Sequence, residues 1–375
     1  MSQSSAIIIG AGIVGLATAR ALSLKGYSVT VIERSEKAVG ASIRNFGMIW
    51  PVGQPEGTLY DRAIRSKMIW KEIAYSTGLS YEEAGSLHVA HYNDEWDVLQ
   101  ELHDSFTKCG RPVAIMKPSE ITKKYTGVNT QGLLGGLYSD TEMIVDPREA
   151  ITVVANYLEE YLDVKFIWKK QVNAVDPGKV FVGNEIIQAD LICICSGADF
   201  ETLYPEQFAT LGMVKCKLQM MRFLPAIDNW RIGTSVCGGL SLIHYNSFNT
   251  APSLPALKKR YETEMAEYLK WGIHVMVSQN DKGELTVGDS HEFGHTFEPF
   301  DKTFINELIT DYLEQIVLCK DWKLIQSWNG IYPKMLNGDT DLFLSPEPGI
   351  FIINGLGGAG MTLAFGFAEE VIDSI

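Results

Sequence analysis

Two glycine-rich stretches contain the residues whose types and spacing most directly suggest chemistry. Residues 10–15 read GAGIVG, which is the G-x-G-x-x-G spacing, and residues 353–366 read INGLGGAGMTLAFG. The second stretch has five glycines and no charged residue in fourteen positions. Glycine has no Cβ, so a ligand can approach its backbone closely. Both stretches therefore predict contacts between backbone N–H groups and a bound molecule.

The first glycine stretch lies between a predicted strand and a predicted helix. The apolar run 6–10 predicts a buried parallel strand, residues 13–24 predict a helix, and residues 27–33 predict a second strand. This is a βαβ unit, in which the glycine spacing binds a dinucleotide. Glu33 ends the second strand, eighteen residues after Gly15, where a carboxylate accepts hydrogen bonds from ribose hydroxyls and repels a 2′-phosphate. The unit therefore predicts NAD or FAD.

Each glycine of this unit has its own predicted role. Gly10 makes the tight turn, Gly12 lets the backbone approach a pyrophosphate, and Gly15 lets the helix pack closely on the strand. The N-terminus of the helix then offers unpaired N–H groups and a positive dipole end to the phosphates.

The rest of the chain predicts two domains that interleave along the sequence. Its 375 residues exceed a single domain of about 150 residues. Asp146 and Pro147 are typical of a helix start, and this helix is predicted to run to about Leu162. Three runs then read as strands that resume the first domain, at 164–168, 179–182 and 190–198.

A second group of elements follows these strands. Alternation between Cys216 and Val287, including LSLIHY at 240–245, predicts an antiparallel sheet. A helix is predicted at 302–317. The last predicted strand, GIFIIN at 349–354, leads into the second glycine stretch and a final helix.

Composition and charge exclude several classes of function. The net charge is −14, which argues against nucleic acid and anionic membranes as partners, because both attract basic surface. The apolar stretch 350–368 is interrupted by glycines, so we do not expect a membrane span. The N-terminus lacks the basic region typical of a signal peptide. Six scattered cysteines without a C-x-x-C motif predict a reduced, cytoplasmic protein.

Over its whole length the chain resembles the glycine oxidase, sarcosine oxidase and D-amino acid oxidase (DAO) family of FAD-dependent oxidoreductases. The resemblance is carried by IIIGAGIVGLATARALSLKGYSVTVIER (7–34), GASIRNFGMI (40–49), VDPRE (145–149), CSGA (195–198), WNGIYPKM (328–335) and INGLGGAGMTLAFG (353–366). It implies an α/β fold, in which a Rossmann-like FAD-binding domain is interleaved with an α+β substrate domain built on a mixed, largely antiparallel sheet. We expect the FAD-binding domain at 1–80, 145–212 and 322–375, and the substrate domain at 81–144 and 213–321.

FAD is the cofactor that the resemblance implies. The second glycine stretch would pass beside the flavin ring, where backbone N–H groups meet the negative charge that develops on reduction. Sarcosine oxidases attach the flavin through a cysteine just before an IYP-like motif. This chain has Gly330 there and its nearest cysteine is Cys319, so we expect non-covalent FAD. The predicted cofactor-binding residues are Gly10, Gly12, Ile13, Val14, Gly15, Glu33, Arg34, Ala41, Ser42, Asn45, Phe46, Gly47, Met48, Val172, Ser196, Gly197, Gly355, Gly357, Gly358, Ala359, Gly360, Met361 and Thr362.

The predicted substrate end departs from the family pattern. Glycine and D-amino acid oxidases have an Arg in a W-x-G-h-R-P-like stretch, and this Arg pairs with the substrate carboxylate. Tyr332 takes that place here, so an ordinary α-amino acid is not the expected substrate. Lys334 and Arg44 are the predicted holders of an anion such as a phosphonate, and the alternative is that Tyr332 only packs and Lys334 is solvated. The predicted substrate contacts are Arg44, Met48, Trp50, Tyr332 and Lys334.

The stretch LTVGDSHEFG at 285–294 resembles a branch of the family associated with aminophosphonate breakdown. This resemblance suggests 2-aminoethylphosphonate or its N-methyl form as the substrate, which is a small-molecule amine that is anionic at its far end. The alternatives are a glycine, sarcosine or D-amino acid oxidase and an FAD-linked amino acid dehydrogenase.

The same stretch contains HEFGH at 291–295, which matches the H-E-x-x-H signature of zinc proteases. That chemistry needs both histidines on one face of a helix. The preceding strand, Gly294 and Pro299 argue against a helix. We therefore expect no metal, with His291 and Glu292 at the end of a strand in the substrate domain.

The expected reaction is oxidation of a C–N bond in a small primary or secondary amine. The product is an imine, which water hydrolyses to an aldehyde plus an amine or ammonia. The flavin carries out the redox chemistry, so no side chain is assigned firmly, and the candidates are Tyr332, His244 and Tyr245. Alternation on the predicted strand 240–245 would turn one of His244 and Tyr245 inward.

The electron acceptor and the assembly are left open by the sequence. Some sarcosine oxidases activate oxygen with a Lys above the flavin, and Thr286 stands at the matching position here. The acceptor is therefore oxygen or another electron acceptor. A homo-oligomer is compatible with the sequence.

Overall fold

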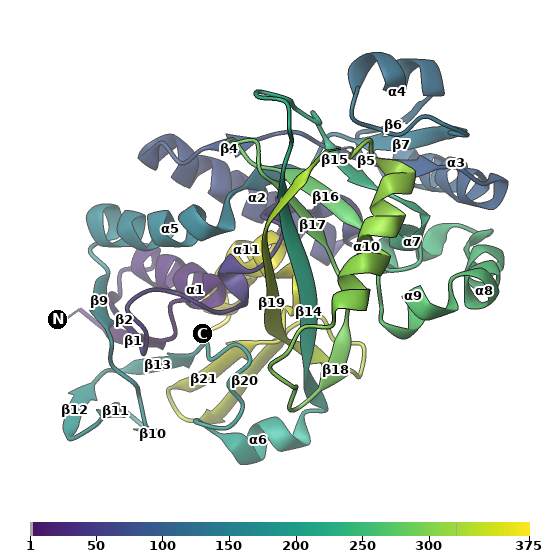
Figure 1. The fold of residues 1–375 in the computed structure, drawn as a ribbon. Coiled ribbons are helices and arrows are strands. Elements are labelled where there is room, and N and C mark those ends of the chain that lie inside the picture. Colours follow the sequence, from purple (N-terminus) through teal and green to yellow (C-terminus); the bar gives the residue numbers. More distant parts are fainter. Residues whose placement is uncertain (1–2, 320) are drawn as a thin grey trace.

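The first sheet has six strands, most of them parallel. The computed structural model describes residues 3–319 and 321–375, and Figure 1 shows their arrangement. In spatial order the strands are β20 (Leu342–Glu347), β21 (Ile350–Asn354), β13 (Leu191–Ile194), β1 (Ser5–Ile9), β2 (Ser28–Glu33) and β9 (Lys165–Trp168). β20 runs antiparallel to β21, and the other neighbouring pairs are parallel. β13 is fully buried, as expected for a parallel strand that is covered on both faces.

One face of this sheet shares a hydrophobic core with four helices. They are α1 (Ile13–Leu24), α2 (Thr58–Thr77), α5 (Pro147–Leu162) and α11 (Gly360–Asp373). The predicted helix start at Asp146 is confirmed, because its side chain accepts a hydrogen bond from the Arg148 backbone N–H. The buried Arg20 of α1 pairs with Glu72 of α2 at 3.0 Å and with Glu369 of α11 at 2.9 Å. The helices are therefore joined by paired charges as well as by apolar contacts.

The second sheet has nine strands and is mixed but largely antiparallel, which confirms the predicted fold class. Its spatial order is β18 (Glu292–Gly294), β14 (Met213–Leu224), β17 (Leu285–Gly288), β16 (Met276–Gln279), β15 (Ser235–Cys237), β5 (Ser86–Ala90), β7 (Gly135–Ser139) and β6 (Val113–Met116), with β19 (Lys323–Met335) on β14. The remaining helices are α3 (Asn93–Lys108), α4 (Pro118–Lys124), α6 (Pro205–Thr210), α7 (Gly239–Leu242), α8 (Leu254–Glu264), α9 (Ala266–Lys270) and α10 (Thr303–Ile316). The helix predicted at 302–317 is α10.

Two small sheets complete the fold. One consists of β3 (Met48–Ile49), β8 (Met143–Val145) and β4 (Tyr81–Glu82), and the other of β10 (Ala174–Asp176), β11 (Lys179–Val182) and β12 (Glu185–Gln188). The run 179–182 was predicted to resume the first domain's strands, but β11 pairs with β10 and β12 in a separate antiparallel sheet. Gly178 and Gly183 have positive φ and begin and end β11 with tight turns. Within the described residues, no helix is long and apolar enough to cross a membrane.

The segment LSLIHY is not a strand, which corrects the prediction. Residues 239–242 form the short helix α7, and His244 and Tyr245 follow in a turn. Contacts with residues distant in the sequence account for the difference. A Cβ at Gly238 would lie 2.5 Å from the Tyr312 hydroxyl oxygen, and a Cβ at Gly239 would lie 2.1 Å from the Tyr261 hydroxyl oxygen. The Leu240 N–H also donates to the Tyr312 hydroxyl oxygen. The glycines therefore let the chain bend tightly against two tyrosines.

The long strand β19 joins the two parts of the molecule. The predicted division placed residues 322–375 in the FAD-binding domain, but β19 pairs with β14 along almost its whole length (Figure 1). At its end, Lys334 forms a β-bridge with Leu356, which lies within the second glycine stretch. β19 thus extends from the second sheet to the glycines that follow β21 of the first sheet.

A buried histidine on β5 makes the stability of this sheet sensitive to acid. His88 is 1% exposed and lies between Trp50 and Phe248, and among the described residues neither ring nitrogen has a hydrogen-bond partner. Burial lowers the pKa of His88 to about 3. This pKa is below that of a histidine in the unfolded chain. His88 therefore does not lower the free energy of unfolding above about pH 6.5, and it lowers that free energy increasingly as the pH falls towards 3.

We predict that His88→Phe will reduce the loss of stability between pH 7.5 and pH 5. Charging His88 in the unfolded state costs the wild type about 2 kcal/mol at pH 5, and the variant has no such proton to bind. The measurement is the thermal midpoint of both proteins at the two pH values. His295→Phe, at an exposed histidine, is the control and should follow the wild type. Parallel pH curves for wild type and His88→Phe would contradict the prediction.

Candidate active site

A large cavity lies between the two sheets. It has a volume of about 1160 Å³ and extends from the first glycine stretch, at Gly10, to Tyr332 on β19. Pockets for small ligands have volumes of about 300–1,000 Å³, so this cavity has room for a dinucleotide and a further small molecule. Its wall combines the carboxyl ends of first-sheet strands with side chains of the second sheet.

Almost all predicted site residues line this cavity. All the predicted catalytic and substrate residues do so, and of the predicted cofactor-binding residues only Gly15 and Gly47 do not. These two glycines allow close packing instead. A Cβ at Gly15 would lie 1.9 Å from the Gly10 carbonyl oxygen, and one at Gly47, where φ is 73°, would lie 1.9 Å from the Val145 carbonyl oxygen.

The first turn of α1 forms the cradle that a pyrophosphate requires. Gly12 is the N-cap, and a Cβ there would project towards the cavity, with Ser42 Oγ at 3.2 Å as its nearest contact. The Ile13 N–H donates to Ser42 Oγ at 2.9 Å. The helix end therefore offers N–H groups, a hydroxyl and bare backbone to an anion.

Glu33, which is predicted to bind a ribose, lines the cavity together with Ser196. Glu33 Oε2 accepts from the Ala11 N–H at 3.0 Å, and Oε1 accepts from the Ser35 N–H at 2.9 Å, so the carboxylate is held at the carboxyl end of β2. Ser196 Oγ is buried and has no hydrogen-bond partner among the described residues. This unpaired hydroxyl and the glycine cradle at Gly12 are suited to contacts with FAD. Arg34 lies nearby and pairs with Asp199 at 2.6 Å.

The second glycine stretch forms the opposite wall. At the end of β21, Asn354 Nδ2 donates to the Gly197 carbonyl oxygen at 2.9 Å and Asn354 Oδ1 accepts from the Gly355 N–H. Gly355 and Gly357 have positive φ values of 80° and 57°. Thr362, in the first turn of α11, accepts from the Trp50 N–H at 2.9 Å. The stretch thus joins three segments around the cavity.

The wall beyond the glycines holds the predicted substrate residues. Tyr332 is buried, and burial together with the Cys216 thiol raises the pKa of its hydroxyl well above the usual value. The hydroxyl therefore stays protonated and can donate. Arg44 Nη1 donates to the Asn329 carbonyl oxygen at 3.1 Å. Trp50 is buried, and its indole N–H has no partner among the described residues.

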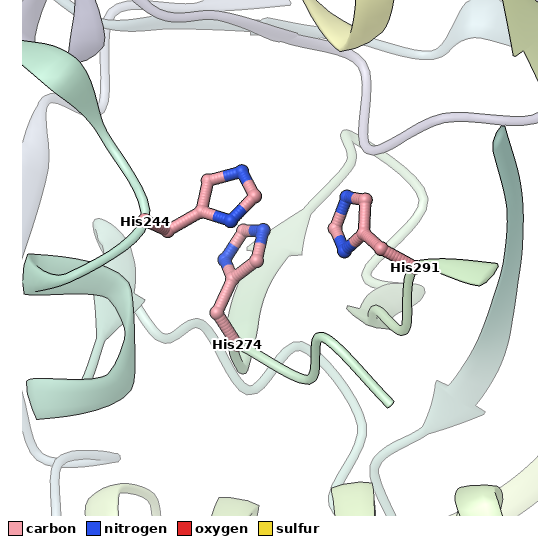
Figure 2. A group of neighbouring side chains, drawn as sticks. All are labelled: His244, His274 and His291. Carbon is pink, nitrogen blue, oxygen red and sulfur yellow. The ribbon is translucent and has the colours of Figure 1, made fainter. Parts of the chain in front are cut away.

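Three histidines meet in the same wall (Figure 2). His244, on the turn after α7, lies with its ring centroid 3.7 Å from that of His274 and 4.9 Å from that of His291. Burial and the two neighbouring imidazoles lower the pKa of His274. His244 is exposed to the cavity, and its confinement there among other side chains, with His291 and Lys334 close by, lowers its pKa as well. The rings of His244 and His274 are therefore neutral near pH 7.

Asp289 is the acidic residue of this group. Its carboxylate lies 3.2 Å from His274 Nε2 and 3.8 Å from His291 Nε2. Burial raises the pKa of Asp289 to about 6, although His291 opposes this shift. Sequence reasoning missed His274 and Asp289, because alternation in a strand does not show which residues of distant segments will meet. His291 was noticed only through the HEFGH motif.

As the sequence predicted, the HEFGH motif does not form a helix. Residues 292–294 are strand β18, His291 is buried at the cavity, and His295 is exposed beyond the strand. The two histidines of the motif therefore do not share a helical face. The expectation that only one of His244 and Tyr245 would face inward was wrong, because both line the cavity. The alternation of a strand does not apply to this segment, since it is not a strand.

We predict that Gly12→Val will give a folded but colourless protein. The backbone of Gly12, at φ −72°, suits any residue, so the added side chain would fill the pyrophosphate space without straining the turn. Flavin absorbance of the purified variant and its far-UV circular dichroism are the measurements. Gly15→Ala is the contrasting variant, because its Cβ would meet the Gly10 carbonyl oxygen at 1.9 Å and should disturb folding itself. A yellow Gly12→Val protein would contradict the prediction.

Comparisons with known proteins agree with this geometry. The model of the DAO family, described as FAD dependent oxidoreductase, matches residues 5–374. The chain is 25% identical to the tRNA 5-methylaminomethyl-2-thiouridine biosynthesis bifunctional protein MnmC of Saccharophagus degradans, over 62% of the chain and 34% of that protein. It is 26% identical to glycine oxidase of Pseudomonas aeruginosa, over 59% of the chain and 63% of that protein.

A solved structure shows the same fold over nearly the whole chain. The structure of glycine oxidase from Bacillus cereus superposes with a TM-score of 0.79 at 16% identity, covering 99% of this chain and 94% of that one. The chain spans a third or less of the length of the first curated relatives it matches. The family match is the broader finding, because it covers almost all residues. This chain belongs to the DAO family and is an FAD-dependent oxidoreductase.

Proposed function

We propose that this enzyme oxidises the C–N bond of a small amine whose far end carries an anion. Its relatives include proteins named glycine oxidase, both by sequence and by structure, which supports an amino compound as the substrate class. The proposed product is an imine, which water hydrolyses to an aldehyde plus ammonia or an amine.

The state of the cations in the cavity wall carries this proposal. Lys170 pairs with Glu185, Lys215 pairs with Glu201, and Arg34 pairs with Asp199, while Arg44 is engaged by a backbone carbonyl. Lys334 also lines the cavity but has no carboxylate partner among the described residues. An unpaired ammonium group beside a ligand cavity attracts an anionic ligand.

A phosphonate fits this wall better than a carboxylate. Tyr332 stands where the amino acid oxidases of the family have an Arg, so the planar fork that matches a carboxylate is missing. A phosphonate is tetrahedral and can accept from several donors at once, which suits a point charge such as Lys334 and the Tyr332 hydroxyl. The substrates proposed are 2-aminoethylphosphonate and its N-methyl form. They are consistent with the resemblance of residues 285–294 to a branch associated with aminophosphonate breakdown.

The chain's own residues prepare the amine. Bound FAD supplies the two-electron acceptor. The substrate amine must be neutral before its carbon can lose a hydride. The neutral imidazole of His244 and the nearby Lys334 ammonium disfavour a second positive charge in this wall, so they favour the neutral amine. Tyr245, whose hydroxyl donates to Met276 Sδ at 3.2 Å, closes the wall beside His244.

Two alternatives to this function differ in substrate and in acceptor. One is a glycine, sarcosine or D-amino acid oxidase, and the other is an FAD-linked amino acid dehydrogenase. Thr286, at the position of the oxygen-activating Lys, is buried in β17 and is absent from the cavity wall. This placement favours an acceptor other than oxygen, or a different oxygen-activating group.

We predict that an amine carrying a phosphonate will reduce the flavin efficiently, whereas glycine, sarcosine and D-alanine will reduce it poorly. Anaerobic bleaching of the flavin absorbance against this panel measures the half-reaction without assuming an acceptor. Lys334 is exposed in the unliganded cavity. If the phosphonate buries it in a charged hydrogen bond, Lys334→Met should weaken phosphonate binding by roughly 1.5–3 kcal/mol, or about ten- to a hundredfold in affinity. Tyr332→Arg should shift the preference towards carboxylates.

Lys215→Met is the matched control for this experiment. Lys215 also lines the cavity, but Glu201 already holds its ammonium group at 2.6 Å, so its loss should leave phosphonate affinity unchanged. If the wild-type enzyme turns over glycine or sarcosine at least as efficiently as 2-aminoethylphosphonate and its N-methyl form, the proposed anion preference fails.

We also predict that the FAD is bound without a covalent link. Among the cysteines of the described residues, Cys195 is the one that lines the cavity, and burial raises the pKa of its thiol to about 12, so it is a poor nucleophile. Acid precipitation should release the yellow colour into the supernatant. Yellow colour retained in the protein pellet would show a covalent bond.

A further inference from the structure

Three of the chain's seven histidines converge on one point of the cavity wall. One ring nitrogen each from His244, His274 and His291 lies within 4.8 Å of the other two. They come from three segments, the turn after α7, the residues before β16 and the residues before β18, and their rings face one another in Figure 2. The cluster is thus produced by the fold and not by a local sequence motif.

The backbone holds two of the histidines in place. His274 and Asp289 exchange backbone hydrogen bonds in both directions, and the His291 N–H donates to the Trp271 carbonyl oxygen. His291 Nδ1 lies 2.8 Å from the Gly272 carbonyl oxygen. A carbonyl only accepts, so Nδ1 carries a proton, and Nε2 is the nitrogen of His291 that can bind a metal. This is the outer hydrogen bond that metal-binding histidines usually make.

Two buried polar atoms of the cluster lack partners among the described residues. His274 Nδ1 and Asp289 Oδ1 are buried and have no hydrogen bond of good geometry among the described residues. Asp289 Oδ1 lies 3.2 Å from His274 Nε2 and Oδ2 lies 3.8 Å from His291 Nε2. A buried carboxylate with an unpaired oxygen is costly unless a cation accompanies it. The cluster therefore has the donors and the charge that a cation would satisfy.

We propose that His244, His274 and His291 bind a divalent transition metal ion such as Zn²⁺, with the Asp289 carboxylate offsetting its charge. Imidazole nitrogens suit zinc and its neighbours in the first transition row, whereas magnesium and calcium require oxygen ligands. This proposal replaces the expectation of no metal. It does not restore the H-E-x-x-H interpretation, because His295 takes no part.

Binding requires only a small closure of the cluster. Zn–N bonds of about 2.0–2.1 Å place tetrahedral ligand nitrogens about 3.4 Å apart, compared with the present limit of 4.8 Å. His244 is the ring that can turn, because it is exposed to the cavity and has no side-chain hydrogen bond among the described residues. His274 and His291 are buried and fixed.

The metal would lie in the substrate half of the cavity. The His291 ring centroid is 6.5 Å from that of Tyr332, and Lys334 is close enough to depress the pKa of His244. Three protein ligands leave a coordination position open. This position would take an oxygen of the substrate's anion, an inference that rests on the proposed function.

Metal binding can be measured on the holoenzyme without any turnover. Protein stripped with a chelator and dialysed is titrated with ZnCl₂ by calorimetry, and the zinc content of the reloaded protein is measured by mass spectrometry. We expect about one zinc per chain. His274→Ala and His291→Ala should weaken binding by more than the roughly 10- to 100-fold that loss of a supporting partner costs. Flavin absorbance reports whether each variant has folded.

His244→Ala and His295→Ala complete the test. His244 lies on a turn and is exposed, so its variant should fold and still lose zinc affinity, whereas His295→Ala should bind zinc like the wild type. The proposal is overturned if stripped wild type binds zinc no better than His274→Ala, or if His295→Ala loses as much affinity as the cluster variants.

A separate measurement distinguishes this proposal from the proposed function. Binding of 2-aminoethylphosphonate is measured by calorimetry in the stripped and the zinc-loaded holoenzyme, and we expect tighter binding when zinc is present. Equal binding would overturn the open-position role and leave the metal site standing. Anaerobic flavin reduction by the amine in stripped protein tests the amine oxidation alone, whatever the result for zinc.

Discussion

The contact between Gly15 and the Gly10 carbonyl is the constraint on which the rest of the structure depends. A Cβ at Gly15 would lie 1.9 Å from that oxygen, and one at Gly10 would lie 2.5 Å from the Cys195 carbonyl oxygen. Because neither position carries a side chain, α1, β1 and β13 can approach one another closely. The N-terminus of α1 then faces the carboxyl ends of the strands. Ligands of open α/β sheets bind at this edge, so the packing of two glycines fixes where the cofactor half of the cavity must be.

Charge pairing separates the scaffold from the site. Arg20 and Arg62 are buried in the helix layer, and each has two carboxylate partners, which is how a protein tolerates charge away from water. In the cavity wall, by contrast, some charged and polar groups have no partner. Lys334 has no carboxylate partner among the described residues, and His274 and Asp289 each keep a buried atom unpaired. These groups line the cavity, where a ligand can pair with them, unlike the unpaired ring of His88, which is enclosed between Trp50 and Phe248.

The sequence predicted the cofactor half well because its signals are local. The strand, turn and helix around Gly12 follow from residues within one βαβ unit, and Glu33 follows from its place at the end of the next strand. The histidine cluster could not be predicted in this way. The turn that carries His244 exists because Gly238 packs against Tyr312, and His274 meets Asp289 through pairing between neighbouring strands. Both depend on contacts between distant residues, which periodicity does not report.

This difference explains how one fold can hold one cofactor and many substrates. The cofactor half is built from backbone N–H groups and glycines, so most changes there collide with backbone or with the ligand. The substrate half is built from side chains on β19 and on the ends of the second sheet. Tyr332 is held by the pairing of β19 with β14, and this pairing uses backbone atoms that any residue provides. A change from Arg to Tyr at this position therefore alters the charge that faces the cavity while leaving the strand and the sheet in place.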